Sequence, residues 1–386
     1  MKKKLFQPKS FVLQWHITER CNWRCKHCYQ SSYTTSELNL KKMEEILIQY
    51  VDLLKKWRIS KENTILQITG GEPFIRDDFP LFLDIVKKYS EHFQWAILSN
   101  GSLLDENIAK KLKSFEINFF QLSLEGLEAV NDEIRGKGSY RKILGAINLL
   151  VRAKIRTVVS FTLTKKNFAE VKKLSENLAP LGVSRLAVRR IAPFGLGGNQ
   201  LKNLVLEPQE LREMYKEIED INRKLKESKY ALIVSGGCEN AVFNDEISNY
   251  ELMGWRTCAV NEGRCITLMP DGEATICRRY PIKIGNVRET SLEEIYYSSL
   301  DKYNIGGSDA PLECHACSNF KACLGGAKCV TYALTGKSAP DVQCWKLFDN
   351  LDESIKYIKH PKLSKKLALF LKNIKRTAVR NVTSAN

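Results

Sequence analysis

Short runs rich in β-branched and aromatic residues alternate with longer amphipathic stretches along most of the chain. The short runs are typical of strands, and the apolar residues of the long stretches recur at the spacing of one helix face. The predicted strands are Phe11–Thr18, Thr64–Ile68, Trp95–Ser99, Phe119–Leu124, Thr157–Leu163, Arg185–Arg190 and Ala231–Val234. The predicted helices lie near 39–57, 78–90, 103–114, 139–153, 167–180 and 207–228.

This order of elements predicts an α/β fold. Repeated strand–helix units of this length form a parallel sheet with right-handed crossovers. The periodicity fits an open doubly wound sheet as well as part of a β/α barrel, and it does not choose between them. In both architectures the loops after the carboxyl ends of the strands carry the chemistry.

The pattern changes after about residue 235, where the helical periodicity lapses and cysteines and turn signals become dense. A segment with so few long elements is expected to depend on bound metal for its stability. The predicted organisation has four segments: an N-terminal extension at 1–10, the α/β domain at 11–234, a cysteine-rich domain at 235–350 and a basic amphipathic helix at 351–386. Such a helix can pack on its own protein, which is the expectation here, or lie against an acidic partner or a membrane surface.

The chain of 386 residues carries a formal net charge of +16 at pH 7. Most of its basic residues are lysines spread along predicted helices, as in Lys41-Lys42, Lys110-Lys111 and Lys172-Lys173. This distribution is typical of solvated helix faces and does not indicate a nucleic-acid partner. No apolar run approaches the roughly 18 residues of a membrane span, and no signal peptide is recognisable. We therefore expect a cytoplasmic protein, whose twelve cysteines stay reduced and serve as metal ligands.

Eleven of the twelve cysteines form two groups. Three of them follow the first predicted strand, and a four-iron cluster takes four thiolates, so this group leaves one iron open to an outside ligand. The other eight supply two complete sets. Zinc is the alternative metal for both groups, although the spacing of the first group is unusual for it. The first group is Cys21, Cys25 and Cys28, and the second is Cys258, Cys265, Cys277, Cys314, Cys317, Cys323, Cys329 and Cys344.

The remaining cysteine, Cys238, is either a small buried residue or a thiol that touches the substrate. Residues suited to ligand binding also follow the next predicted strands. In Gly70-Gly71-Glu72-Pro73, the glycines let backbone approach a ligand closely and the carboxylate can accept hydrogen bonds from an ammonium group. The other positions of this kind are Ser99, Asn100, Ser123, Glu125 and Arg135.

The spacing Cys21-x3-Cys25-x2-Cys28, with Tyr29 after the last cysteine, resembles that of the radical S-adenosylmethionine (radical SAM) enzymes. The resemblance implies a partial (β/α)6 barrel of the TIM type, with the amino and carboxylate groups of S-adenosylmethionine on the open iron. It also implies that the reduced cluster splits this cofactor to a 5'-deoxyadenosyl radical, which abstracts hydrogen from the substrate. The implied cofactor contacts are Tyr29, Gly70, Gly71, Glu72, Pro73, Ser99, Asn100, Ser123, Glu125 and Arg135.

Two of these positions have roles in that family. The loop at Gly70–Pro73 binds the methionine amino group, and the arginine that Arg135 matches pairs with the cofactor carboxylate, a task suited to a guanidinium fork. From its sequence context alone, Arg135 can also be read as a surface arginine at a helix end. At Glu125 the family usually has Asp, so this chain carries the longer carboxylate.

The eight downstream cysteines resemble the SPASM extension of the same superfamily, which holds two auxiliary 4Fe-4S clusters. One departure is visible, because five residues separate Cys323 from Cys329 where three are usual, and Gly325 and Gly326 in that insertion let the loop bulge. The implied ligands of the auxiliary cluster nearer the active site are Cys258, Cys265, Cys277 and Cys329. Those of the outer cluster are Cys314, Cys317, Cys323 and Cys344.

SPASM proteins mostly modify ribosomally made peptides or protein side chains. We therefore predict an enzyme that crosslinks, epimerises or oxidises a peptide or protein substrate and takes electrons from a partner such as a flavodoxin or ferredoxin. Only about ten residues precede the first predicted strand. Leader recognition is therefore expected from a separate protein, the basic tail or direct substrate contacts.

Two arginines keep a second class of function open. Arg278 and Arg279 follow Cys277, where the sulfatase-maturing branch of the family carries an acidic proton acceptor. With Cys238 they are the candidate substrate-contacting residues, unless the arginines only form salt bridges in the small domain. Their charge suits the oxidative or decarboxylating tailoring of a small carboxylate-rich molecule, such as a haem-like tetrapyrrole. A third class, a non-catalytic electron relay, is disfavoured by the loop at Gly70–Pro73.

Overall fold

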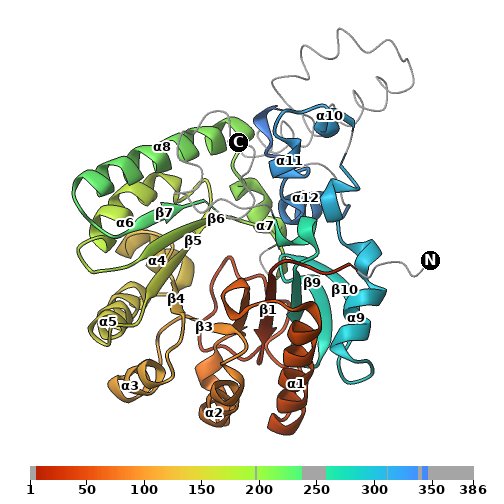
Figure 1. Ribbon diagram of the computed structural model, residues 1–386. Coiled ribbons are helices and arrows are strands. Elements are labelled where there is room, and N and C mark those ends of the chain that lie inside the picture. The colour runs from red at the N-terminus through yellow and green to blue at the C-terminus, as the bar shows by residue number, and fades with distance from the viewer. Residues whose placement is uncertain (1–5, 196–197, 237–257, 311, 338–340, 347–386) are drawn as a thin grey trace.

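One curved sheet organises the molecule (Figure 1). The computed structural model describes residues 6–195, 198–236, 258–310, 312–337 and 341–346, so Cys238 and the predicted helix at 351–386 lie outside the described residues. Its ten strands follow the order β10-β9-β8-β1-β2-β3-β4-β5-β6-β7 in the described part of the chain. They are β1 Phe11–His16, β2 Thr64–Thr69, β3 Gln94–Ser99, β4 Phe119–Ser123, β5 Thr157–Leu163, β6 Arg185–Arg190, β7 Ile233–Ser235, β8 Cys265–Leu268, β9 Glu273–Cys277 and β10 Tyr280–Asn286.

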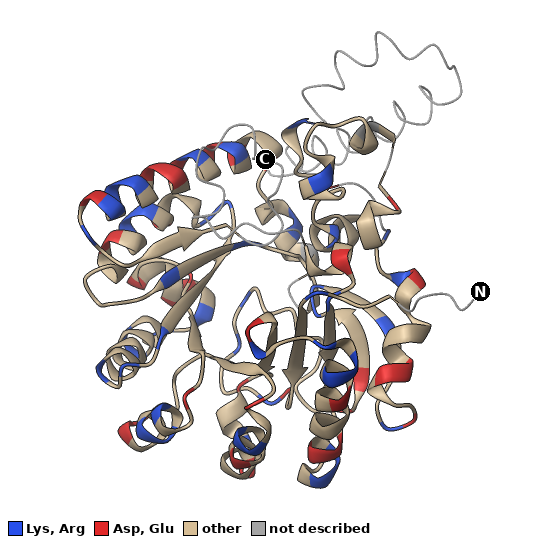
Figure 2. Cartoon of the chain, viewed as in Figure 1, with Lys and Arg blue, Asp and Glu red and all other residues tan. Residues whose placement is uncertain are grey.

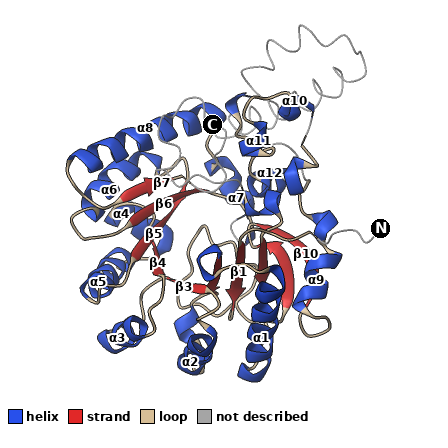
Figure 3. Ribbon diagram, in the orientation of Figure 1, coloured by secondary structure: helices blue, strands red, loops and turns tan. Residues whose placement is uncertain are grey.

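Helices cover the convex side of this sheet, as Figure 3 shows. Strands β1 to β7 pair in parallel in chain order, and the edge strands β7 and β10 do not pair with each other in the described residues, so the sheet forms a partial barrel. This confirms the predicted fold class. The helices are α1 Leu40–Trp57, α2 Phe79–Tyr89, α3 Glu106–Ser114, α4 Glu128–Arg135, α5 Ser139–Arg152, α6 Val171–Leu178, α7 Gly198–Leu201, α8 Pro208–Glu227, α9 Leu292–Ser298, α10 Leu312–His315, α11 Phe320–Cys323 and α12 Lys328–Thr335.

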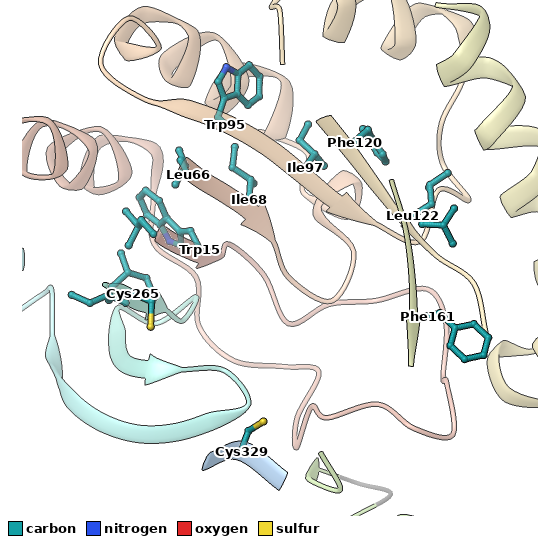
Figure 4. Close-up of a cluster of buried hydrophobic side chains, with 14 of the residues drawn as sticks. Trp15, Leu66, Ile68, Trp95, Ile97, Phe120, Leu122, Phe161, Cys265 and Cys329 are labelled. Carbon is teal, nitrogen blue, oxygen red and sulfur yellow. The ribbon is translucent and has the colours of Figure 1, made fainter. Parts of the chain in front are cut away.

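The alternation along β1 decides which side chains face the barrel interior. Trp15 packs edge-on against Phe82 of α2, with their ring centroids 5.5 Å apart, so it belongs to the layer between sheet and helices. Figure 4 shows this layer, which continues through Ile97 and Phe120. Successive side chains of a strand point to opposite faces, so His16 points into the concave interior.

Charge is distributed over the outside of the helices. Figure 2 shows Lys and Arg mixed with Asp and Glu along α1 and α8, which fits the expectation of solvated helix faces. No helix in the described part of the chain combines the length and apolarity needed to cross a membrane.

The cysteine-rich segment continues the barrel sheet. Strand β8 pairs in parallel with β1, from Val12 opposite Cys265 to Trp15 opposite Leu268, and β9 and β10 extend this edge with antiparallel pairing. Strand β1 is therefore flanked on both sides, and residue 235, the predicted domain boundary, separates strands of one sheet. The cysteines of this segment are consequently anchored to the same strand that precedes the first cysteine group.

A buried ion pair joins the barrel to the last described residues. Arg190, at the end of β6, donates from Nη1 and Nη2 to the two carboxylate oxygens of Asp341, at 3.0 and 2.9 Å, and both side chains are 3% exposed. Gln343 supports the pair by accepting from Arg190 at 3.0 Å and donating to the carbonyl of Leu206 at 2.8 Å. This contact closes the open side of the barrel with the segment that carries Cys344.

Replacing Asp341 with Asn should destabilise the protein strongly. The change leaves the buried charge of Arg190 without its partner, a situation that typically costs about 3–5 kcal/mol. Urea unfolding measures this loss. The matched control is Asp220→Asn, which breaks the exposed pair between Asp220 and Arg223 on α8 and should cost less than about 1 kcal/mol. Equal losses in the two variants would contradict a closing role for the Arg190 pair.

Candidate functional site

The loop after β1 carries the first three cysteines at the carboxyl edge of the sheet. The amide of Cys28 donates to the carbonyl of Cys25 at 3.1 Å, and the amide of Trp23 lies 3.4 Å from the Sγ of Cys21. All three cysteines are half-buried thiols outside disulfides. Burial raises the pKa of Cys21 to about 11, so this thiol becomes a thiolate only beside strong positive charge such as iron.

The donors around these sulfur atoms suit thiolate ligands. Arg135 Nη1 lies 3.8 Å from Cys25 Sγ, and Asn100 Nδ2 lies 4.0 Å from Cys21 Sγ. Among the described residues, no three His, Cys, Asp or Glu side chains converge as ligands of a single metal ion. A four-iron cluster binds each thiolate through a different iron and does not need that convergence. Three spread thiols, two of them beside N–H donors, therefore fit a cluster.

The carboxylate of Glu72 lies at the end of β2 and is completely buried. It accepts from Ser99 Oγ and from the amide of Asn100, each at 2.8 Å, and from the amide of Phe74 at 3.3 Å. Burial raises its pKa to about 7 against these hydrogen bonds. A cation beside Glu72 would favour the charged form, which is the property that an ammonium-binding carboxylate needs.

Gly70 and Gly71 bring this loop against the cysteine loop. A Cβ on Gly70 would lie 2.5 Å from the carbonyl oxygen of Thr18, and one on Gly71 would lie 2.3 Å from that of Arg20. The amide of Gly71 donates to Thr18 at 2.8 Å, and that of Glu72 donates to Arg20 at 2.9 Å. The close approach made possible by the glycines is therefore to the backbone just before Cys21. Pro73 starts the short 3-10 helix η2, Pro73–Ile75, behind them.

Glu125 lies just beyond β4 and forms a buried network with two side chains. His27 Nε2 lies 2.9 Å from Glu125 Oε1, Arg135 Nε donates to the same oxygen at 3.1 Å, and the amide of Thr162 donates to Oε2 at 2.6 Å. Burial alone would raise the pKa of Glu125, but the charges of Arg135 and His27 outweigh it and lower this pKa to about 2. Glu125 thus stays ionised and holds Arg135 next to Cys25. Ser123, the last residue of β4, is half-buried.

The predicted ligands of the nearer auxiliary cluster lie on or beside four elements of the appended segment. Cys258 precedes the 3-10 helix η7, Ala259–Glu262, while Cys265 starts β8 and Cys277 ends β9. Cys329 lies on α12, and Figure 4 shows it and Cys265 on different elements. The Sγ of Cys265 lies 3.3 Å from the carbonyl oxygen of Ile276, so Cys265 lies beside the residue that precedes Cys277.

In the outer group, Cys314 lies on α10 and Cys323 ends α11, while Cys317 lies between these helices and Cys344 follows α12. The amide of Cys317 donates to the carbonyl of Cys314 at 3.1 Å. Burial, with the charges of Asp341 and of neighbouring thiols including Cys314 and Cys317, raises the pKa of Cys323 to about 12. The insertion after Cys323 forms a tight turn in which three successive residues, Leu324, Gly325 and Gly326, have positive φ values of 51°, 85° and 76°. The amide of Cys344 donates to the carbonyl of Asp341 at 3.0 Å.

The two arginines after Cys277 have different environments. Arg279 donates from Nη2 to the backbone carbonyl of Arg190 at the end of β6. Arg278 points toward the cysteine loop instead, with its guanidinium carbon 5.0 Å from the centroid of the Tyr29 ring. That ring also contacts His16 edge-on at 6.1 Å. Tyr29 therefore lies between β1 and the arginine that follows β9.

The sequence missed three polar residues of this region. His16 and Glu19 are buried around the cysteine loop, and His27 bonds to Glu125. The alternation of β1 could have placed His16 on the concave face. Nothing local to the sequence indicates that Glu19 faces Arg278.

A partial barrel with three cysteines after its first strand and cysteine pairs in an appended segment defines a class of iron–sulfur enzyme. The profile of the Radical SAM superfamily matches residues 15–178, and that of an iron–sulfur cluster-binding domain, SPASM, matches residues 258–318. The chain therefore belongs to the radical SAM superfamily and carries a C-terminal SPASM domain. Membership implies S-adenosylmethionine and 4Fe-4S clusters as cofactors.

Characterised relatives fall into two groups of activity. The chain is 26% identical to the Fe-coproporphyrin III synthase of Methanosarcina barkeri over 366 residues, covering 88% of each protein. It is also 26% identical to the mycofactocin maturase MftC of Mycolicibacterium smegmatis over 347 residues, covering 86% of this chain and 82% of the relative. The fold is similar to that of SuiB from Streptococcus suis bound to S-adenosylmethionine, with a TM-score of 0.67 and 18% identity. The match covers 87% of this chain and 77% of the SuiB chain.

Proposed function

We propose that Cys21, Cys25 and Cys28 hold the cluster that binds S-adenosylmethionine, and that the enzyme abstracts hydrogen from a peptide or protein substrate. The observation that carries this proposal is the meeting of the cysteine loop, Glu72 and Arg135 at one carboxyl edge of the sheet. When bound, the reduced cluster and its cofactor supply a 5'-deoxyadenosyl radical. The chain's part is to bind, orient and exclude competing reactions.

Two charged residues have distinct tasks in this proposal. Glu72, held by Ser99 and Asn100, receives the methionine ammonium of the cofactor. Arg135, kept in place by ionised Glu125, presents its guanidinium to the cofactor carboxylate beside Cys25. Tyr29 and the backbone at Gly70 and Gly71 keep the cysteine loop in place around them.

The eight remaining cysteines are proposed to hold two auxiliary clusters, for a total of three. Their sets are those expected from the sequence, with Cys329 completing the one near the barrel and Cys344 the outer one. A reducing partner such as a flavodoxin or ferredoxin is proposed to supply electrons.

Peptide maturation is supported by relatives of that activity, including MftC and the subtilosin biosynthesis protein AlbA of Bacillus subtilis. The test is mass spectrometry of candidate precursor peptides, from genes beside that of this enzyme, after co-expression with it. A mass change that needs Cys25 would support this function. If the enzyme cleaves S-adenosylmethionine but leaves the peptides from every such gene unmodified, this function is contradicted.

A second candidate is the oxidative or decarboxylating tailoring of a small carboxylate-rich molecule. Two relatives support it by name, the Fe-coproporphyrin III synthase and an AdoMet-dependent heme synthase of the same archaeon. The specific observation in its favour is the guanidinium of Arg278, which lies over the Tyr29 ring and has two buried N–H donors without an acceptor. Neighbouring genes for tetrapyrrole enzymes, rather than for a short peptide, would favour this candidate.

Replacing Glu72 with Gln should weaken S-adenosylmethionine binding by about tenfold to a hundredfold. The amide keeps the shape but removes the charge that faces the ammonium group, and hydrogen bonds to charged groups are worth about 1.5–3 kcal/mol. Equilibrium binding of the cofactor to the reconstituted protein measures the change. The control is Glu116→Gln on the exposed surface, where the affinity should stay at the wild-type value. An unchanged affinity in the Glu72 variant would remove this residue from the cofactor site.

A further inference from the structure

Arg278 is a half-buried cation between the two cysteine regions. It directly follows Cys277 at the end of β9, and its side chain is 14% exposed. The guanidinium lies over the ring of Tyr29, the residue after Cys28, so it adjoins the first cysteine loop as well. A substrate held between the first cluster and the nearer auxiliary cysteines would therefore meet this side chain.

One edge of this guanidinium has no hydrogen-bond acceptor. The Nε and Nη2 atoms are both buried and make no hydrogen bond. These two N–H groups point in the same direction and form the fork that binds a carboxylate through two parallel hydrogen bonds. A buried charged donor without an acceptor is costly, and a bound carboxylate would remove this cost.

The nearest carboxylate does not fill this edge. Glu19 Oε1 lies 3.8 Å from Nη2, which is an ion pair beyond hydrogen-bond distance. The other oxygen of Glu19 accepts from the hydroxyl of Thr35, and the backbone carbonyl of Glu19 accepts from Gln30, so this residue is held on the cysteine-loop side. Glu19 thus partly balances the charge of Arg278 and leaves both donors available.

A second buried side chain with a nitrogen atom that makes no hydrogen bond lies nearby. His16 is 1% exposed, points to the concave face and has no hydrogen-bond partner at Nε2. Burial, followed by the charge of Arg278, keeps its pKa well below the ordinary value, so the ring is neutral and adds no second positive charge. Both side chains contact or approach the same Tyr29 ring.

Arg279 provides the internal comparison. It has the same side chain one residue later, but its guanidinium donates to the carbonyl of Arg190 and belongs to the contact that closes the barrel. The structure therefore separates the two arginines, one as part of the scaffold and the other facing the site.

We propose that the Nε and Nη2 edge of Arg278 binds a carboxylate group of the substrate, with His16 as a neighbouring side chain. This inference rests on the proposed function, because it assumes that a substrate occupies the space beside the first cysteine loop. The carboxylate can belong to an acidic peptide, at a side chain or terminus, or to the acidic side chains of a tetrapyrrole. Both sources present the same planar, anionic group to the fork.

The test compares matched acid and neutral probes on the reconstituted holoenzyme with S-adenosylmethionine. One pair is iron coproporphyrin III and its tetramethyl ester, and the other is an Asp- and Glu-containing peptide and its Asn and Gln counterpart. Binding is measured for the wild type, Arg278→Met, Arg278→Lys and the control Arg279→Met. Arg278→Met keeps the length of the side chain and removes the fork, while Arg278→Lys keeps the charge alone.

The wild type should bind the acid form of one pair at least about tenfold more tightly than the neutral form. Arg278→Met should abolish that preference, Arg278→Lys should retain part of it, and Arg279→Met should keep it. The preferred pair identifies the source of the carboxylate. The inference is overturned if the preference for the acid form survives in Arg278→Met. It is also overturned if neither acid probe binds the wild type at millimolar concentration.

Two further readouts separate the possible failures. A parallel loss of affinity for S-adenosylmethionine in Arg278→Met would assign the arginine to the cofactor and overturn the inference. Formation of 5'-deoxyadenosine by the wild type tests the proposed function separately. If the wild type splits the cofactor but shows no carboxylate preference, only the role of Arg278 fails, and if it does not split the cofactor, the proposed function fails.

Discussion

Replacing Cys25 with Ala should abolish the reductive cleavage of S-adenosylmethionine while the auxiliary clusters persist. The change removes the middle one of the three thiols. It also removes the sulfur that lies 3.8 Å from Arg135 Nη1 in the wild type. A cluster held by only two protein thiolates should not survive reconstitution. Iron should fall from about twelve to about eight atoms per chain, and 5'-deoxyadenosine should not rise above the level formed without cluster.

The control for this variant lies in the same loop. Lys26 is exposed and its ammonium faces Glu133 on the surface, so Lys26→Gln should retain both the full iron content and cofactor cleavage. Unaltered cleavage in Cys25→Ala would refute the assignment of the first cysteine group. Loss of all iron from that variant would instead mean that the three clusters are not independent.

Replacing Cys317 with Ala has the second largest expected effect. Cys317 lies between the short helices that carry Cys314 and Cys323, and segments with so few long elements depend on metal to stay folded. About four irons per chain should be lost, and limited proteolysis should cut the segment around 312–337 much faster than in the wild type. The first cluster should still bind S-adenosylmethionine.

Ser318→Ala is the matched control, since it removes a polar side chain from the neighbouring position without touching a predicted ligand. Its iron content and proteolysis rate should equal those of the wild type. If Cys317→Ala kept all its iron, the outer set would be wrong. Zinc in place of iron in the wild type would contradict the assignment of both auxiliary sets to iron–sulfur clusters.

The barrel strands were predictable because each carries its signal locally. The first six predicted strands agree with β1 to β6 within a few residues, and the predicted strand at Ala231–Val234 corresponds to β7, Ile233–Ser235. Strands β8 to β10 were not predicted. Strands β8 and β9 are short, and the partner that stabilises β8 is β1, some 250 residues earlier in the chain. Helix α4 was missed for a related reason, because its eight residues have no side-chain cap at Leu127.

The site was predictable as far as it depends on strand ends. The cysteine loop, Glu72 and Asn100 lie together because parallel strands deliver their carboxyl ends to one edge. The difference between Arg278 and Arg279 was not predictable, since adjacent identical residues differ only in what they meet in three dimensions. The role of the two glycines before Glu72 was also hidden, because the backbone they admit belongs to the loop after β1.

The central claim is that one cluster has an iron left open by the protein, to be filled by S-adenosylmethionine. Electron paramagnetic resonance of the reduced, reconstituted protein, recorded with and without the cofactor, tests it most directly. We expect the signal of one cluster to change on adding S-adenosylmethionine and those of the two auxiliary clusters to stay as they were, and the change should be absent in Cys25→Ala. A wild-type spectrum that the cofactor leaves unaltered would contradict the account.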